Sequence, residues 1–315
     1  MREMIVKGIH IDDTFAEAFN MRAAGVVITA DSARWARQAA VTMIGFGTSV
    51  IGCGCEAGID SELSPRETPD RRPGIRVLLF AVSTSELQKQ LQNRIAQCVL
   101  TAPGSACYAG FQGDEVLKLG NALRFFGDGW QISKRLAGKH FWRVPVMDGE
   151  FVCEATTGLT KVAVGGGNLL IMGRNSKTTL AAAEAAVSAI KRVPDVIMPF
   201  PGGIVRSGSK VGSKYKASAS TNEAYCPTLR GAVKSALGPE IGSVLEIVID
   251  GLTSTAVAAA MRAGLAAMIK LGPKRGAVRI GAGNYGGKLG PHHFHLRDLL
   301  PVSYTHLTLP TILLV

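Results

Sequence analysis

The chain is poor in aromatic residues, which make up 6% of its 315 residues. Its basic residues outnumber the acidic ones by 35 to 24, giving a net charge of +11, yet they form no long runs. Such a charge favours acidic partners, namely nucleic acid, anionic membranes or small polyanions. Nucleic-acid binding, however, usually requires a basic stripe with aromatic stacking surfaces. We therefore expect small anionic molecules as partners, and no nucleic acid.

Long apolar runs and paired cysteine motifs are also missing. No stretch of about 18 apolar residues that could span a membrane occurs, and residues 1–14 contain no secretory signal. The six cysteines are scattered, with Cys53 and Cys55 the only close pair and no C-x-x-C motif. Reduced thiols fit this distribution best. These features predict a cytoplasmic protein with no membrane partner.

The most informative residue that is present is Glu246. It interrupts the otherwise apolar run 244–249, which lies between Gly242 and Gly251 and is typical of a buried strand. A buried carboxylate must be paired, neutral or functional, because burying a lone charge is very costly. Burial raises the pKa of a glutamate and suits it to proton transfer near neutral pH. The alternatives are an exposed edge position or a structural ion pair with an arginine.

The chain repeats itself at an offset of 170 residues. Residues 76–103 and 246–273 each contain a strand, a Ser/Thr cluster that can cap a helix, a helix with apolar residues at i, i+4, i+8 and i+11, and a proline stop. Each copy is preceded by a predicted strand, helix and strand, at 26–29, 32–43 and 49–51 and at 169–172, 178–190 and 196–198. Each ends in a predicted closing strand, at 123–127 and 278–281.

The order β-α-β-β-α-β in each half indicates the split βαβ, ferredoxin-like arrangement. The predicted fold class is therefore α+β, with two similar α/β sandwich lobes from an internal duplication. We place the N-terminal, proximal-type lobe at residues 1–146 and the C-terminal, distal-type lobe at 147–300. Residues 301–315 differ in composition from the rest, and we expect a non-native tail there.

Two glycine-rich segments imitate nucleotide-binding motifs. Residues 281–286 match G-x-G-x-x-G after a strand, but Gly287, Gly290 and Pro291 follow where a helix must open, which excludes a dinucleotide site. Residues 203–211 lack the adjacent Gly-Lys-Ser/Thr of a P-loop. Residues 204–238 instead combine glycines with six basic residues and one acid, Glu223. This pattern is typical of a loop that holds an anionic ligand, or of a solvated basic loop.

The only histidine cluster contains His292, His293 and His295. Residues 293 and 295 share one face of a strand and could pair as zinc ligands, but no second His/Cys group with metal-ligand spacing accompanies them. No G-x-S-x-G nucleophile motif is present either. We therefore predict no metal and no covalent nucleophile.

Several long segments together resemble one family, the formylmethanofuran–tetrahydromethanopterin formyltransferases. The resemblance spans about residues 5–300, in order and in both lobes. The segments that carry it begin with DTFAEAF (13–19), GFGTSVI (45–51), EAGID (56–60) and FFGDG (125–129), and continue with PFPGGIV (199–205), SKVGSK (209–214), STN (220–222), AYCPT (224–228), EIVI (246–249) and AGNYGGKLG (282–290).

The resemblance implies an acyltransferase that moves a formyl group from N-formylmethanofuran to N5 of tetrahydromethanopterin by direct transfer in a ternary complex. It places the acid/base carboxyl at Glu246, with no metal or permanently bound cofactor. It also implies a homotetramer, with a hydrolase partner in bacteria that oxidise formaldehyde; a role in methanogenesis stays open. The substrate-binding candidates in the matching segments and the basic loop are Phe200, Pro201, Gly202, Gly203, Arg206, Lys210, Lys214, Asn222, Tyr225, Asn284 and Tyr285.

Three other functions remain open from the sequence. The first is a non-catalytic pterin- or methanofuran-binding subunit of a formyltransferase/hydrolase complex, in which Glu246 would be dispensable. The second is a regulatory protein that binds one anionic metabolite. The third is a nucleic-acid binder, whose affinity would fall steeply with salt.

Overall fold

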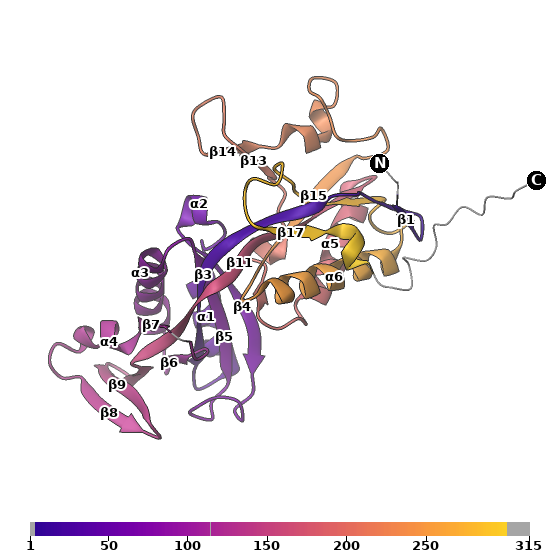
Figure 1. Ribbon diagram of the computed structural model, residues 1–315. Helices are drawn as coiled ribbons and strands as arrows, with labels where there is room; N and C mark the ends of the chain where they lie inside the picture. The colour runs from indigo at the N-terminus through magenta and orange to yellow at the C-terminus, as the bar shows by residue number, and fades with distance from the viewer. Residues whose placement is uncertain (1–3, 114, 301–315) are drawn as a thin grey trace, which may run out of the picture.

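A computed structural model describes residues 4–113 and 115–300 of the chain, and the expected tail at 301–315 lies outside the described residues. Figure 1 shows two lobes side by side, joined by two long strands that run through both. These strands are β3 (Phe15–Thr29) and β11 (Thr156–Gly173), which pair antiparallel at their crossing.

The N-terminal half contains one complete split βαβ unit. Its sheet has the order β4-β5-β3-β6, with every neighbouring pair antiparallel. In this order the first and third strands of the unit lie in the centre, as the ferredoxin-like arrangement requires. The elements are β3, α1 (Ala33–Ile44), β4 (Glu56–Leu63), β5 (Gly74–Ala81), α3 (Thr84–Arg94), which continues as the π-helical turn η1 (Ile95–Val99), and β6 (Ala106–Ala109).

The C-terminal half repeats the same unit with the sheet order β12-β15-β11-β16. Each helix begins where the repeat predicts, because a side chain caps its first turn: Ser32, Ser83, Asn175 and Thr253 each accept a backbone N–H three residues on. The duplication and the fold class are thus confirmed. The elements are β11, α5 (Ser176–Ile190), β12 (Val196–Ile197), β15 (Ser243–Gly251), α6 (Ser254–Leu271) and β16 (Arg279–Gly281).

Two predicted strands are wrong. Residues 49–51 begin the short helix α2 (Val50–Cys53), since the Ser49 hydroxyl accepts the Ile51 N–H and caps it. Residues 123–127 belong to the helical turns α4 (Gly120–Leu123) and η2 (Arg124–Gly127). The repeat matched them with residues 278–281 as a closing strand, but Phe125 and Phe126 are exposed. The strand that closes the N-terminal unit is β6, which pairs with the end of β3.

The hydrophobic cores exchange residues between the halves. The core of the C-terminal lobe contains Ile9, Ile11 and Ala16 from the start of the chain. The core of the N-terminal lobe contains Phe151 and Leu159. The exchange follows from strands β3 and β11, which each enter the opposite lobe, so that the spatial lobes do not coincide with a cut in the sequence.

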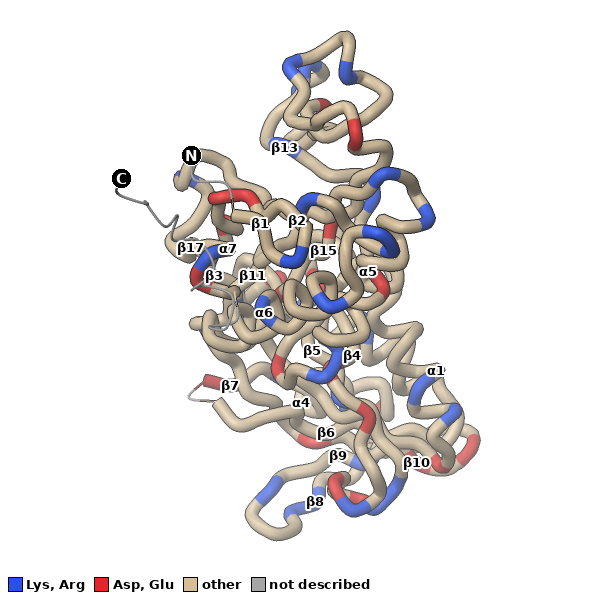
Figure 2. The backbone as a smooth tube through the Cα atoms, turned by 90° about the vertical axis from the view of Figure 1, so that its right-hand side faces the viewer, with Lys and Arg blue, Asp and Glu red and all other residues tan. Residues whose placement is uncertain are grey.

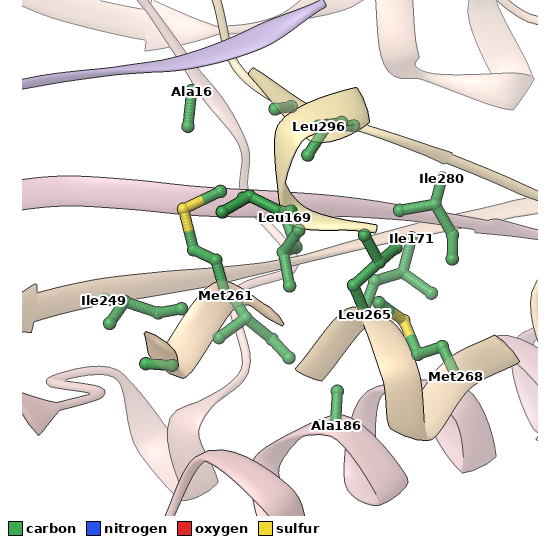
Figure 3. Close-up of a cluster of buried hydrophobic side chains, with 14 of the residues drawn as sticks. Ala16, Leu169, Ile171, Ala186, Ile249, Met261, Leu265, Met268, Ile280 and Leu296 are labelled. Carbon is green, nitrogen blue, oxygen red and sulfur yellow. The ribbon is translucent and has the colours of Figure 1, made fainter. Parts of the chain in front are cut away.

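Helix α6 is long and apolar enough to cross a membrane by composition alone. Here it packs on the sheet as a core helix. Met261, Leu265 and Met268 lie against Leu169 and Ile171 of β11, as Figure 3 shows. The apolar positions therefore recur every three to four residues on the face that the sheet covers.

The remaining elements extend these two units. A segment between β12 and β15 projects from one end of the molecule and carries several lysines and arginines (Figure 2). It holds η3 (Pro201–Gly203), the β13–β14 hairpin (Ser209–Val211, Ala219–Thr221), η4 (Glu223–Tyr225) and η5 (Pro227–Leu229). The others are β1 (Met4–Val6), β2 (Ile9–Ile11), β7 (Glu115–Lys118), β8 (Ile132–Leu136), β9 (Lys139–Val146), β10 (Gly149–Glu154), β17 (His292–His295) and α7 (Leu296–Leu299).

The lobes also meet where β4 approaches β12. Arg76 bridges Asp60 and Asp195 at 3.0 and 2.7 Å, and the Asp195 N–H donates to Asp60 at 2.7 Å. Beside this cluster, a Cβ atom on Gly58 would lie 2.7 Å from the Cβ of Ile197. Only glycine therefore allows the two strands to approach this closely.

Gly58→Ala is expected to destabilise the protein by about 1–3 kcal/mol, because the added methyl group overpacks the contact with Ile197. Urea unfolding would measure the loss. Gly231→Ala is the matched control, since a Cβ there meets nothing within 4 Å. Equal midpoints for the two variants would show that the lobes can shift to admit the methyl group.

Candidate active site

Glu246 is held in place by backbone bonds on both sides of its strand. In β15 it pairs with Leu170 of β11. On the other side its N–H donates to the Val205 carbonyl at 2.8 Å, and its carbonyl accepts the Val205 N–H at 2.7 Å. Because side chains alternate along a strand, Ile247 and Ile249 enter the core while Glu246 and Val248 face a cavity.

The cavity has a volume of about 420 Å³ and lies between parts of the chain far apart in sequence. One wall comes from α2 and β4, and another from the inserted segment that carries the β13–β14 hairpin (Figure 1). Its surface is mostly apolar and includes three carboxylic acids, Glu17, Glu56 and Glu246. Cavities of this size with a few polar groups are typical sites for small molecules.

Burial raises the pKa of Glu246 from its ordinary value of 4.5 to about 7. Burial is the only cause of this shift, so no neighbouring arginine or lysine holds the carboxylate. The alternative of a structural ion pair is thus not what the structure shows. A carboxyl group that is half ionised near neutral pH can take up a proton and return it, as general acid–base catalysis requires.

The pKa of Glu17 is shifted in the opposite direction to that of Glu246. Its carboxylate accepts the backbone N–H groups of Tyr285 at 2.8 Å, Gly287 at 3.0 Å and Gly290 at 3.2 Å, and also that of Leu289. Burial alone would raise the pKa of Glu17, but these four hydrogen bonds outweigh it and lower the pKa. Glu17 is therefore an ionised anchor for the glycine-rich segment 281–290, which the sequence did not reveal.

Tyr285 connects this anchored segment to the inserted one. Its hydroxyl donates to the Ser209 carbonyl at 3.2 Å, and its ring lines the cavity next to Glu246. Burial raises the pKa of the Tyr285 hydroxyl, and the nearby Glu246 and Glu17 add to the effect. The phenol therefore stays neutral and can donate or accept a hydrogen bond at physiological pH.

The structure brings most of the predicted binding residues to the Glu246 end of the cavity. Phe200, Lys210 and Tyr285 line the same cavity as Glu246. Arg206, Asn222 and Tyr225 line an adjoining pocket of about 50 Å³, to which Glu246 and Tyr285 also contribute. Lys214 lines a third hollow behind the hairpin. Four predicted residues line none of these three spaces: Pro201, Gly202, Gly203 and Asn284.

Three of those four shape the backbone instead. Gly202 and Gly203 have φ values of 64° and 83°, which favour glycine, and make the tight turn after Phe200. The Asn284 amide oxygen accepts the Gly286 N–H at 2.7 Å and bends the segment that carries Tyr285. For Gly202 and Gly203, the close approach of the backbone to a ligand stays a prediction.

The basic segment is partly neutralised. The Lys210 ammonium pairs with the Glu223 carboxylate, and this contact lowers the pKa of Glu223. Lys214 is exposed at the tip of the hairpin. An anionic ligand would thus meet the positive charge of exposed residues such as Lys214 at the rim of the site. The ammonium group of Lys210 is already held in position by Glu223.

Sequence reasoning missed a pair of buried carboxyl groups, Glu56 of β4 and Asp250 of β15. Burial raises the pKa of both groups, and for Asp250 the proximity of Glu56 raises it further. A signal was available, because Asp250 continues the alternation of Glu246 and Val248 on the same face of the strand. Nothing in the sequence indicated Glu56 as its partner.

The histidine cluster lies on β17, which pairs with β3, and its side chains line neither the cavity nor the adjoining pocket. The His292 ring contacts the Asn20 amide oxygen at 2.8 Å, and the rings of His293 and His295 lie 4.6 and 5.0 Å from that of Phe15. Across residues 4–113 and 115–300, no group of three or more His, Cys, Asp or Glu side chains is arranged to hold a metal ion.

The chain is thus a two-lobed α+β protein made of two similar split βαβ units. Its mostly apolar cavity contains three carboxylic acids, one of which, Glu246, is suited to proton transfer on a small molecule. The family model described as formylmethanofuran-tetrahydromethanopterin formyltransferase matches residues 4–146, and one described as FTR, proximal lobe, matches residues 149–299. The chain belongs to this formyltransferase family. The second description gives the name proximal lobe to the C-terminal half, the reverse of the expectation from the sequence.

Among curated relatives, the formylmethanofuran–tetrahydromethanopterin formyltransferase of Methylococcus capsulatus is 61% identical over 298 residues, covering 94% of this chain and 100% of the relative. A relative from Methylorubrum extorquens, named as one of the subunits of a formyltransferase/hydrolase complex, is 56% identical over 306 residues, covering 95% and 98%.

Two solved structures share the fold over nearly the whole chain. The formyltransferase/hydrolase complex of Methylorubrum extorquens with methylofuran matches with a TM-score of 0.93 and 56% identity, covering 95% of this chain and 99% of that chain. The formyltransferase of Methanosarcina barkeri matches with a TM-score of 0.88 and 44% identity, covering 94% and 100%.

Proposed function

We propose that the chain transfers a formyl group from N-formylmethanofuran to N5 of tetrahydromethanopterin. The observation that carries the proposal is Glu246, a carboxyl group with a pKa of about 7 in an apolar cavity between the lobes. Family membership supports the choice of substrates, since the relatives bear this activity in their names. The two co-substrates bind and leave, and we propose no resident cofactor.

The reaction needs one proton moved between two nitrogens. The N5 lone pair attacks the formyl carbon, forming the new C–N bond and a tetrahedral intermediate. The ionised Glu246 carboxylate takes the proton from N5. The protonated group then gives it to the methanofuran nitrogen as the old C–N bond breaks, so that Glu246 returns to its starting state. Nearby aromatic residues, Phe200, Tyr225 and Tyr285, supply surfaces against which the substrate rings can pack.

We further infer a cytoplasmic enzyme that works as a homotetramer and in company with hydrolase subunits. The support for the partners is the name of the Methylorubrum extorquens relative, which places it in a formyltransferase/hydrolase complex. Formaldehyde oxidation is the pathway we favour, because the relatives from Methylococcus capsulatus, Methylobacillus flagellatus and Methylorubrum extorquens are 56–61% identical, whereas the Methanocaldococcus jannaschii and Methanosarcina relatives are 45–47% identical. The alternative pathway is methanogenesis, in which N-formylmethanofuran is the formyl donor.

The test is formyl transfer by the purified chain ending at Leu300. Formation of N5-formyl-tetrahydromethanopterin from N-formylmethanofuran would be followed with both substrates present. Steady product formation is expected. Pterin binding without any transfer would instead identify a non-catalytic binding subunit.

Lys214→Ala is expected to raise the KM for the more anionic co-substrate by roughly 3- to 10-fold and to reduce the salt dependence of kcat/KM, because a charge at the rim of a site acts through long-range attraction. Lys134→Ala, an equally exposed lysine on β8 of the other lobe, is the control. Steady-state kinetics at low and high salt would compare the two. Identical KM values for the two variants would show that the hairpin does not contribute to binding of the anionic co-substrate.

A further inference from the structure

The Glu56–Asp250 pair joins the two lobes, and its Glu56 member lies in the wall of the cavity. The Glu56 carboxylate accepts the Val50 N–H at 3.1 Å, and Asp250 Oδ1 accepts the Gly166 N–H at 3.1 Å. The second oxygen of Asp250 is buried and meets no N–H or O–H donor among the described residues. Its hydrogen-bonding neighbour is the Glu56 carboxyl, another acceptor when ionised. Two carboxyl groups in contact cannot both be ionised, so the pair holds a proton.

The surroundings assign that proton to Asp250. Asp250 is fully enclosed, with 0% of its surface exposed, whereas Glu56 is 6% exposed and lines the cavity. The charged form is disfavoured more strongly where solvent is excluded more completely. A protonated Asp250 Oδ2 then donates to Glu56, which gives the orphaned oxygen its partner. Glu56 remains ionised, with lone pairs left for a donor in the cavity.

The other carboxylates of the cavity are already engaged. Glu17 is occupied by four backbone N–H groups, and Glu246 is assigned to proton transfer. Glu246 and Asp250 lie four residues apart on one face of β15, so Glu246 and the Glu56 carboxyl beside Asp250 line different parts of the same cavity. A ring system that occupies the cavity can therefore contact both carboxyl groups.

We propose that Glu56 determines specificity for the pterin by accepting hydrogen bonds from its aminopyrimidine edge, while N5 at the other side of the ring faces Glu246. The edge presents two adjacent N–H donors, the ring N–H and the exocyclic amino group, which match the two oxygens of one carboxylate. Asp250 is a positioning residue that holds Glu56 ionised and oriented. This inference rests on the proposed function for the identity of the ring.

The test measures equilibrium binding of tetrahydromethanopterin by calorimetry, with no formyl donor present. Glu56→Gln is expected to weaken binding by tenfold or more, because an amide N–H would face the N–H donors of the ring. Asp250→Asn is expected to stay within about threefold of the parent, because its amide can donate to Glu56 as the proton did and its oxygen can still accept the Gly166 N–H.

A pterin analogue without the exocyclic amino group separates recognition from structure. The parent is expected to bind it at least tenfold more weakly than the natural pterin, and Glu56→Gln to bind the two about equally. Equal losses in the two variants, or undiminished discrimination in Glu56→Gln, would overturn the proposal. If Glu56→Gln fails to fold, equal binding of pterin and analogue by the parent would overturn it. Pterin binding by a parent that transfers no formyl group would count against the proposed reaction alone.

Discussion

Glu246→Gln is expected to lower kcat for formyl transfer by roughly a hundredfold to ten-thousandfold, the range that general acid–base catalysis contributes. Glutamine keeps the size of the side chain but can neither take the proton from N5 nor return it. Binding of the substrates should change little, because glutamine fills the same position in the wall. Single-turnover kinetics with both substrates saturating would measure the chemical step.

The pH profile provides a second, independent readout. Since the base must be ionised, kcat/KM of the parent should rise with pH through about 7, the value to which burial raises the pKa of Glu246. The variant should lack this rise. Glu184→Gln, an exposed carboxylate on α5, is the control and should retain it. An unchanged rate in Glu246→Gln would move the acid/base role to another group of the cavity.

The pH dependence of stability provides another measure of the pKa of Glu246. The pKa of Glu246 is higher in the folded protein than its ordinary value of 4.5. The folded state therefore binds the proton more tightly, and this contribution to stability is present below pH 4.5 and is lost as the pH rises through about 7. Glu246→Gln removes this dependence, so the difference in stability between parent and variant should change with pH across that window.

Glu17→Gln is expected to lower the free energy of unfolding by about 3 kcal/mol, because one side chain satisfies four buried N–H groups and an amide cannot accept from all of them. The segment 281–290 would lose its anchor, and Tyr285 would no longer be held beside Glu246. Chemical denaturation at pH 7 would measure the loss. Glu62→Gln, on the exposed end of β4, should cost less than about 1 kcal/mol.

The contribution of Glu17 to stability depends on pH in the opposite direction to that of Glu246. The hydrogen bonds lower the pKa of Glu17 below its ordinary value of 4.5. Its contribution is thus present above that value and is lost as the pH falls below it through the folded-state pKa. The parent should lose stability in acid faster than Glu17→Gln does. Parallel curves for the two proteins would mean that the four N–H groups find other acceptors.

The repeated strand–helix pattern and Glu246 could be predicted from the sequence because local signals define them. Capping residues, apolar periodicity and a carboxylate within an apolar run all lie within a few residues of each other. The strand predicted at residues 123–127 was wrong because the segment matches 278–281 only by its place in the repeat, whereas the tertiary structure leaves Phe125 and Phe126 exposed in helical turns. The short helix at residues 50–53 was missed because a Ser-Val-Ile run favours a strand until its serine caps the turn.

The other site residues depend on contacts between distant parts of the chain. Glu17 meets its four donors some 270 positions later, and Glu56 meets Asp250 across the boundary of the lobes. No periodicity or motif in a single sequence relates such positions. Asp250 was the exception, since it shares the alternation of Glu246 along one strand.

The exchange of residues between the two cores also sets an order of events during synthesis. The N-terminal core can close once Leu159 has left the ribosome. Ile9, Ile11 and Ala16 are made long before Leu296, Leu299 and Leu300, which belong to the same core. The apolar residues at positions 9–16 therefore stay without these partners until the C-terminal lobe has been made, a state in which nascent chains are prone to aggregate.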